Sequence, residues 1–182
     1  METTNTSASP FDNLSEQVVE LLSNGGSLGT VYDYQDEDYE VVYALGHNLY
    51  SQERYLDAMK AFGFLVMHNQ LERRYMNAFA SSLQMLKLYK DAIQYYCMAS
   101  VMDMEDPMPT YHTAECMIPL GMYAEARQAL ELVVEQAGTP ERAALRERAQ
   151  ALLGLLDRHK ASGSPALIEI TTRPAGAKPT AH

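Results

Sequence analysis

Tyr55-Leu56-Asp57-Ala58, Tyr89-Lys90-Asp91-Ala92 and Tyr123-Ala124-Glu125-Ala126 repeat one pattern: tyrosine, any residue, an acidic residue and alanine. Successive copies of this pattern are 34 residues apart. Each copy opens a run of apolar residues at helical spacing, which predicts the start of an α-helix. A constant period of this length indicates that the chain is built from stacked structural repeats.

A second series of small residues, Gly46, Ala80 and Ala114, has the same spacing and lies one helix earlier in each repeat. With the alanines of the first pattern, it places a small residue in each of two helices per repeat. Paired helices approach closely where both carry a small side chain, so these positions predict the contacts within each hairpin. The neighbouring packing positions of the first helix are Val42, Leu45 and Leu49.

The spacing and the residues Leu45-Gly46 and Ala58-x-x-x-Phe62 match the tetratricopeptide repeat, a helical hairpin of 34 residues. The tryptophan and the closing proline of that motif are missing from all three copies. The sequence therefore predicts an all-α fold, in which three tetratricopeptide-type helical hairpins form a short solenoid. Solenoids of this kind commonly present a concave surface to a partner chain.

We expect the repeats to form one domain over residues 37–159. A helix at 140–159 is predicted to cap it, because Thr139-Pro140-Glu141 combines a capping residue, a first-turn proline and an acid at the positive end of the helix dipole. The register would place Glu147 and Arg148 at packing positions, so the repeats themselves end before this helix.

The two ends of the chain have a different composition. Residues 1–10 are small and polar, and the tail at 160–182 is rich in Ser, Gly, Pro and Ala, so both are predicted to be disordered. Residues 11–36 are predicted to form an N-terminal helix, which stops at Asn24-Gly25-Gly26, and then a loop over 27–36.

Composition narrows the range of partners. The formal net charge of -10 disfavours nucleic acid and anionic membrane surfaces as partners, because their phosphates would repel the chain. No apolar run reaches the roughly 18 residues that a membrane helix needs, so no membrane insertion is expected. Cys97 and Cys116 are predicted to be buried free thiols of a reduced compartment. Met1–Pro10 shows no secretory signal, and we expect a cytoplasmic protein.

A stripe of first-helix residues lies beside the packing positions and should line the inner curve of the solenoid. It mixes aromatic, amide and charged side chains, which suits an extended peptide, although a solvated helix face with incidental tyrosines is the alternative. We call this set the inner stripe and predict that it forms the peptide-binding groove. Its members are Glu40, Tyr43, His47, Tyr50, Arg74, Asn77, Ser81, Gln84, Met108, Tyr111, Glu115 and Ile118.

No residue pattern points to catalysis. His112, Glu115 and Cys116 are close in sequence, but a metal site needs at least three convergent ligands, and Cys116 should point about 100° away from Glu115. We expect His112 to pack at a repeat interface instead. The sequence has no nucleophile elbow, phosphate-binding loop or His-Glu-x-x-His motif. We therefore expect no enzyme activity, no cofactor and no metal.

Three segments in order carry a resemblance to a known family. They are Tyr43-x-Leu45-x-x-x-Leu49-Tyr50, Ala99-x-x-Met102-Asp103, and the run from Asp106-Pro107 through Tyr111-His112 to Ala114-Glu115-Cys116. Over roughly residues 11–137, the chain resembles the class II chaperones of type III secretion systems. His47 departs from the resemblance, which implies an aromatic or apolar residue at that position.

The resemblance implies a bacterial cytoplasmic chaperone that binds hydrophobic translocator proteins before export. It also implies that an extended client segment docks in the concave groove, and that two copies pair through the N-terminal helix region. A transcription activator is a further partner of some members. The alternatives are a generic tetratricopeptide-repeat adaptor and a regulatory coactivator of secretion genes.

Overall fold

The structure, a computed structural model, describes Ser23, Gly29 and residues 34–162. Between Asp36 and Ser162, seven α-helices and two short 3₁₀ helices follow one another without a strand. In chain order, they are α3 (Asp36–Ser51), α4 (Tyr55–His68), α5 (Arg73–Met85), α6 (Tyr89–Met102), α7 (Met108–Met117), η1 (Ile118–Leu120), α8 (Tyr123–Gln136), η2 (Pro140–Arg142) and α9 (Ala143–Ser162).

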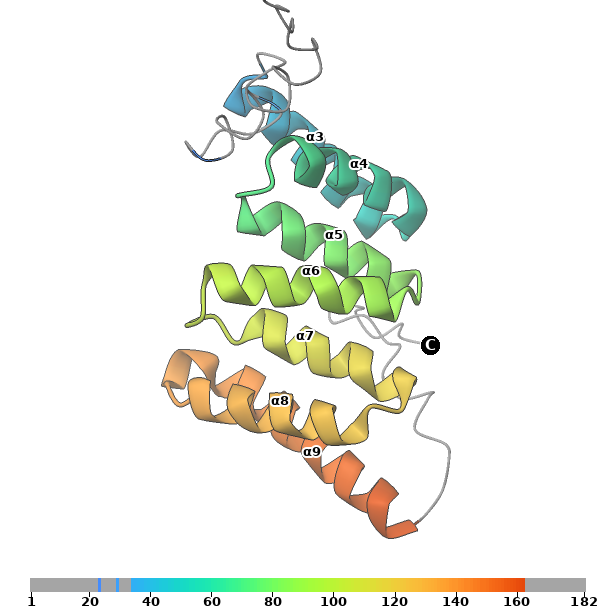
Figure 1. The fold of residues 1–182 in the computed structure, drawn as a ribbon, viewed down its shortest axis with the longest axis vertical. Helices are drawn as coiled ribbons and strands as arrows, with labels where there is room; N and C mark the ends of the chain where they lie inside the picture. The colour runs from blue at the N-terminus through green and yellow to red at the C-terminus, as the bar shows by residue number, and fades with distance from the viewer. Residues whose placement is uncertain (1–22, 24–28, 30–33, 163–182) are drawn as a thin grey trace, which may run out of the picture.

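These helices stack along the long axis of the molecule, with α3 and α4 at one end and α8 and α9 at the other (Figure 1). Each helix packs chiefly against its neighbours in sequence, so α3/α4, α5/α6 and α7/α8 form three consecutive hairpins. The predicted all-α fold of three stacked hairpins is confirmed.

The six small residues all lie at buried helix contacts. Ala58, Ala80, Ala92, Ala114 and Ala126 have no exposed surface, and Gly46 is buried in α3. A Cβ atom on Gly46 would lie 2.5 Å from the Phe62 ring of α4, closer than any real contact of that kind. The pattern that predicted the hairpins therefore marks the points where paired helices meet.

The turn inside each hairpin repeats as closely as the helices do. Glu53, Lys87 and Gly121 occupy equivalent positions and have φ values of 60°, 62° and 74°. This left-handed conformation is comfortable for glycine and costs other residues free energy. The third hairpin alone has glycine there, so the sequence did not reveal the shared geometry of the three turns.

A C-terminal core joins the last hairpin to α9. Leu145, Ala149 and Leu156 of α9 pack with buried residues of α7 and α8. The helix begins after the turn η2 and continues to Ser162, beyond the predicted end at residue 159. The Thr139 side chain makes no capping hydrogen bond, contrary to the sequence prediction.

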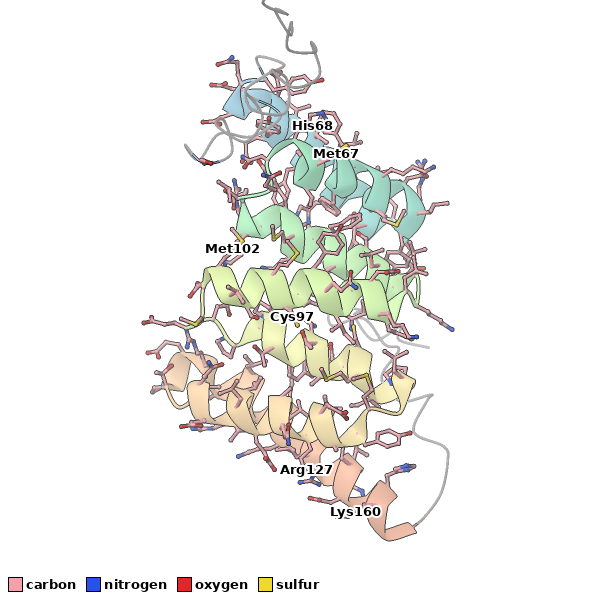
Figure 2. All side chains as sticks on the ribbon, in the orientation of Figure 1. Met67, His68, Cys97, Met102, Arg127 and Lys160 are labelled. Carbon is pink, nitrogen blue, oxygen red and sulfur yellow. The ribbon has the colours of Figure 1, made fainter. Side chains whose placement is uncertain are left out.

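The structure corrects two further expectations. Leu45 is 51% exposed, because it points away from the contact that its neighbour Gly46 makes. Cys97 lies exposed on α6 (Figure 2), whereas Cys116 is buried as predicted. Burial raises the pKa of the Cys116 thiol, which makes it unreactive.

The N-terminal expectations are only partly testable. Gly29, predicted to lie in a loop, is helical, and its carbonyl accepts a hydrogen bond from the Tyr34 N–H. Asp36 already belongs to α3. The predicted disordered segment 1–10, the Asn24-Gly25-Gly26 stop and the tail beyond Ser162 lie outside the described residues. In the described part of the chain, no helix combines the length and apolarity needed to cross a membrane.

Candidate peptide-binding groove

The inner-stripe residues of the first hairpin are more exposed to solvent than two of those in the third hairpin. Tyr43 and Tyr50 are partly buried and His47 is exposed. Tyr111 and Ile118 are only 5% and 2% exposed, because they belong to the core that α9 completes. The assignment of these two residues to an accessible groove is corrected, since Tyr111 of α7 and Ile118 of η1 are buried in one core cluster with residues of α9.

One end of the stripe is organised around Arg74. Its guanidinium forms ion pairs with Glu40 at 2.8 Å and Glu72 at 3.3 Å, and it lies 5.2 Å from the centre of the Tyr43 ring and 5.6 Å from that of Tyr75. The hydrogen bonds with Glu40 and Glu72 raise the pKa of Arg74. These pairs are exposed and individually weak, but together they orient Tyr43 and join α3 to α5.

His47 behaves as an aromatic side chain in the middle of the stripe. Its ring centre lies 4.4 Å from that of Tyr43 and 5.2 Å from that of Phe62, both in edge-on geometry. The His47 side chain is exposed overall, but the partial loss of water around its ring lowers the pKa of His47, which favours the neutral imidazole. The departure at His47 therefore preserves the aromatic character that the resemblance implies at this position.

The other end of the stripe contains a set of hydrogen bonds that we call the Glu115 network. The Tyr96 hydroxyl lies 3.0 Å from that of Ser81 and donates to Gln84 Oε1 at 2.8 Å. Gln84 Nε2 donates to Glu115 Oε2 at 3.2 Å, and His112 Nδ1 lies 2.8 Å from the same oxygen. The His112 ring also stacks on Tyr96, so it packs at a repeat interface as predicted.

Tyr50, the last inner-stripe residue of α3, packs its ring edge-on against that of Tyr55 in the same hairpin. Burial, with smaller contributions from Tyr55 and Glu115, raises the pKa of Tyr50 to about 12. Gln84 and Glu115, which the sequence assigned to one surface, are joined by a hydrogen bond between the second and third hairpins.

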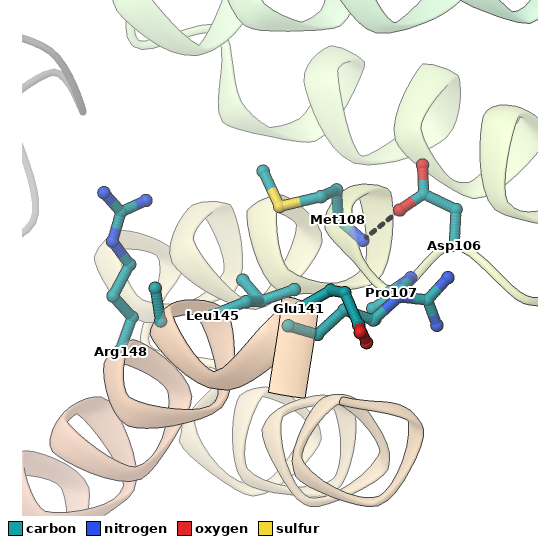
Figure 3. Close-up of a pocket in the computed structure, with 8 residues that line it drawn as sticks. Asp106, Pro107, Met108, Glu141, Leu145 and Arg148 are labelled. Atoms are coloured by element: carbon teal, nitrogen blue, oxygen red, sulfur yellow. Dashed lines mark hydrogen bonds between the residues drawn. The ribbon is translucent and has the colours of Figure 1, made fainter. Parts of the chain in front are cut away.

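Met108 lies apart from the tyrosines. It lines a pocket of about 320 Å³ between the start of α7 and the start of α9, and Leu145 and Arg148 contribute from α9 (Figure 3). The Met108 N–H donates to Asp106 Oδ1 at 3.0 Å, which orders the beginning of α7.

Sequence reasoning missed Glu72, Tyr75 and Tyr96 as parts of this surface. Tyr96 is buried in α6, and nothing in the period indicates that its hydroxyl reaches Ser81 and Gln84. Asn77 Oδ1 is buried and has no hydrogen-bond partner among the described residues. In the same part of the chain, no three His, Cys, Asp or Glu side chains are placed to hold a metal ion.

Comparisons with known proteins identify relatives of the whole helical domain. No protein-family model matches the chain. The low calcium response locus protein H of Yersinia pseudotuberculosis is 30% identical over 134 residues, which cover 73% of this chain and 80% of the relative.

Two solved structures show the same fold and carry bound translocator segments. PcrH in complex with the chaperone-binding region of PopD is 32% identical, with a TM-score of 0.66, and the match covers 70% of this chain and 96% of PcrH. SycD of Yersinia enterocolitica, in complex with a peptide of the translocator YopD, is 31% identical, with a TM-score of 0.65, and the match covers 69% and 97%. From its repeats, its fold and these relatives, the chain belongs to the class II translocator chaperones of type III secretion systems.

Proposed function

We propose that this chain is a cytoplasmic chaperone that binds hydrophobic translocators of a type III secretion system and keeps them soluble and separate before export. The observation that carries the proposal is the match to PcrH, which covers 96% of a protein solved with the chaperone-binding region of its translocator. We further propose that the chain acts by binding alone, without enzyme activity.

The proposed binding surface is the accessible part of the inner stripe. Tyr43 and Tyr50 offer apolar ring surface, and burial of each apolar anchor of a client contributes about 1.5–3 kcal/mol. Two or three such anchors support micromolar or tighter binding after the entropic cost of association. The preformed stack keeps that cost low, since the groove is ordered before the client arrives. The accessible members are Glu40, Tyr43, His47, Tyr50, Arg74, Asn77, Ser81, Gln84, Met108 and Glu115.

We also propose that two copies of the chain pair through the N-terminal region that precedes α3. SycD, a relative of similar fold, has been crystallised as an alternative dimer. Analytical ultracentrifugation of the full chain and of a version that lacks residues 11–33 tests this proposal. A dimer that persists without the segment would contradict it.

Co-expression tests the main proposal. The chain is produced together with the translocators of the same bacterium, and the soluble fraction is purified through a tag on the chain. We expect the translocators to remain soluble and to co-purify in a defined complex. Translocators that stay insoluble in the presence of the folded chain would refute the proposed function.

A further inference from the structure

Glu115 is a largely buried acid at the point where the second and third hairpins meet. Its side chain is 19% exposed, and that of His112, beside it, is 22% exposed. Gln84 from α5 and His112 from α7 both point polar hydrogens at Oε2, which fixes the direction of the carboxylate. The group is therefore held in place before any ligand binds.

Neither a lysine nor an arginine forms an ion pair with Glu115 among residues 34–162. Arg148 of α9 acts electrostatically on Tyr111 but makes no ion pair with Glu115. The donors that contact the carboxylate are the Gln84 amide and the His112 imidazole, and the Tyr111 hydroxyl is a further hydrogen-bond partner. A partly buried carboxylate without a permanent counter-ion is costly, and a cation supplied by a ligand would offset that cost.

Tyrosine rings lie near this carboxylate, because the ring centre of its partner His112 is 5.3 Å from that of Tyr96 and 5.5 Å from that of Tyr111. Glu115 also contributes to the raised pKa values of Tyr50, Tyr96 and Tyr111, in each case after the larger effect of burial. Aromatic faces beside an acid are the chemistry that recognises ammonium and guanidinium groups. Of the three rings, that of Tyr50 is the most accessible from the groove.

We propose that Glu115 binds the side chain of a lysine or arginine in the client segment, with the Tyr50 ring packed against its aliphatic stem. The inference rests on the proposed function and adds to it a positively charged anchor among the apolar ones. It predicts that the segments this chain selects combine apolar residues with one basic residue at a fixed spacing. A charge-assisted pair of this kind fixes the register of an extended peptide more sharply than an apolar contact.

Peptides provide the test. Overlapping peptides of about 15 residues, which cover the translocators of the same bacterium, are screened by fluorescence anisotropy against the full chain. In each peptide that binds, every lysine and arginine is replaced in turn by norleucine, which keeps an aliphatic stem and removes the charge. We expect one replacement to weaken binding about tenfold or more.

A double-mutant cycle then assigns the effect to Glu115. In a Glu115→Gln chain, the same norleucine replacement should change affinity less than about twofold, because the charge that it met is gone. Glu135→Gln is the matched control, since it removes one negative charge from an exposed position of α8. The control chain should keep the full tenfold dependence.

Two outcomes overturn the inference while leaving the proposed function intact. One is a peptide that still binds the wild-type chain after all its basic residues have been replaced. This result needs only the wild-type chain, so it remains informative even if Glu115→Gln fails to fold. The other is an equal norleucine effect in wild-type and Glu115→Gln chains of equal helicity. If no peptide binds and no translocator co-purifies, the proposed function fails and this inference fails with it.

The chain's own tail is a rival source of the cation, because Arg173 and Lys178 follow α9. A full-length Arg173→Gln, Lys178→Gln variant should bind the basic peptides with unchanged affinity. A severalfold gain in affinity would mean that the tail competes for Glu115, and it would overturn the assignment of the site to the client.

Discussion

Tyr43 and Tyr111 occupy the same position in the first and third repeats, yet the structure uses them differently. Tyr43 is partly buried and faces the groove beside His47 and Arg74. Tyr111 is 5% exposed within the core that α9 completes. The difference shows that position along the stack, as well as position within the repeat, decides whether a tyrosine recognises a ligand or supports the fold.

The largest expected effect is at the closed end of the stripe. Tyr111→Ala should lower the free energy of unfolding by about 3–5 kcal/mol, because it opens a cavity between α7 and α9. Urea unfolding followed by circular dichroism measures this change. A loss below about 1 kcal/mol would mean that α9 does not cover Tyr111 in solution.

At the open end, Tyr43→Ala should mainly affect binding. We expect the affinity for the client segment to fall by about 1.5–3 kcal/mol, the value of one buried aromatic anchor, while helicity is retained. Isothermal titration with a peptide identified by the screen gives the affinity, and far-ultraviolet circular dichroism gives the helix content. If Tyr43→Ala destabilised the chain as much as Tyr111→Ala, the two positions would be equivalent core positions and the comparison would fail.

The three hairpin turns can be compared in the same way, because each has one residue in the left-handed conformation. Glu53→Gly and Lys87→Gly should each stabilise the chain by up to about 1 kcal/mol, because they relieve a left-handed conformation that glycine adopts freely. Gly121→Ala should destabilise it by about the same amount. Thermal unfolding of the three variants checks the signs, and a Gly121→Ala chain as stable as wild type would contradict the shared turn geometry.

The smallest expected effect is a pH dependence at His47. Because burial lowers the pKa of His47, the folded chain binds its proton less readily than the unfolded chain does. The stability linked to this histidine is present above the unfolded pKa of about 6.5 and is lost as the pH falls below it. His47→Phe should therefore gain stability relative to wild type between pH 7 and pH 5. A stability difference that does not change over that range would show that His47 does not titrate in this way.

The period predicted the hairpins because close helix contacts demand small side chains at fixed positions, as Gly46 and Ala92 illustrate. The same period could not reveal which part of the inner stripe would be covered. That outcome depends on α9, whose sequence does not repeat the motif and whose contact with Tyr111 is a tertiary one. The period also could not predict the hydrogen bond between Tyr96 and Ser81, because a hydroxyl contact between two helices produces no repeating pattern in the sequence.

Of the twelve predicted groove residues, the structure groups Glu40, Tyr43 and Arg74 at one end and Ser81, Gln84 and Glu115 at the other. Their role in binding a client stays a prediction. Cys97 shows the limit of compositional reasoning, since free cysteines are usually buried and the thiol on α6 is exposed.

The bonds from Tyr96 through Gln84 to Glu115 cross the boundary between the second and third hairpins. Apolar packing between helices tolerates small rotations, whereas directional polar bonds do not. The bend of the stack at this boundary is consequently locked at one angle. A client segment that displaced Gln84 from Glu115 would weaken the interface between these two hairpins. Client binding would therefore change the curvature of the solenoid.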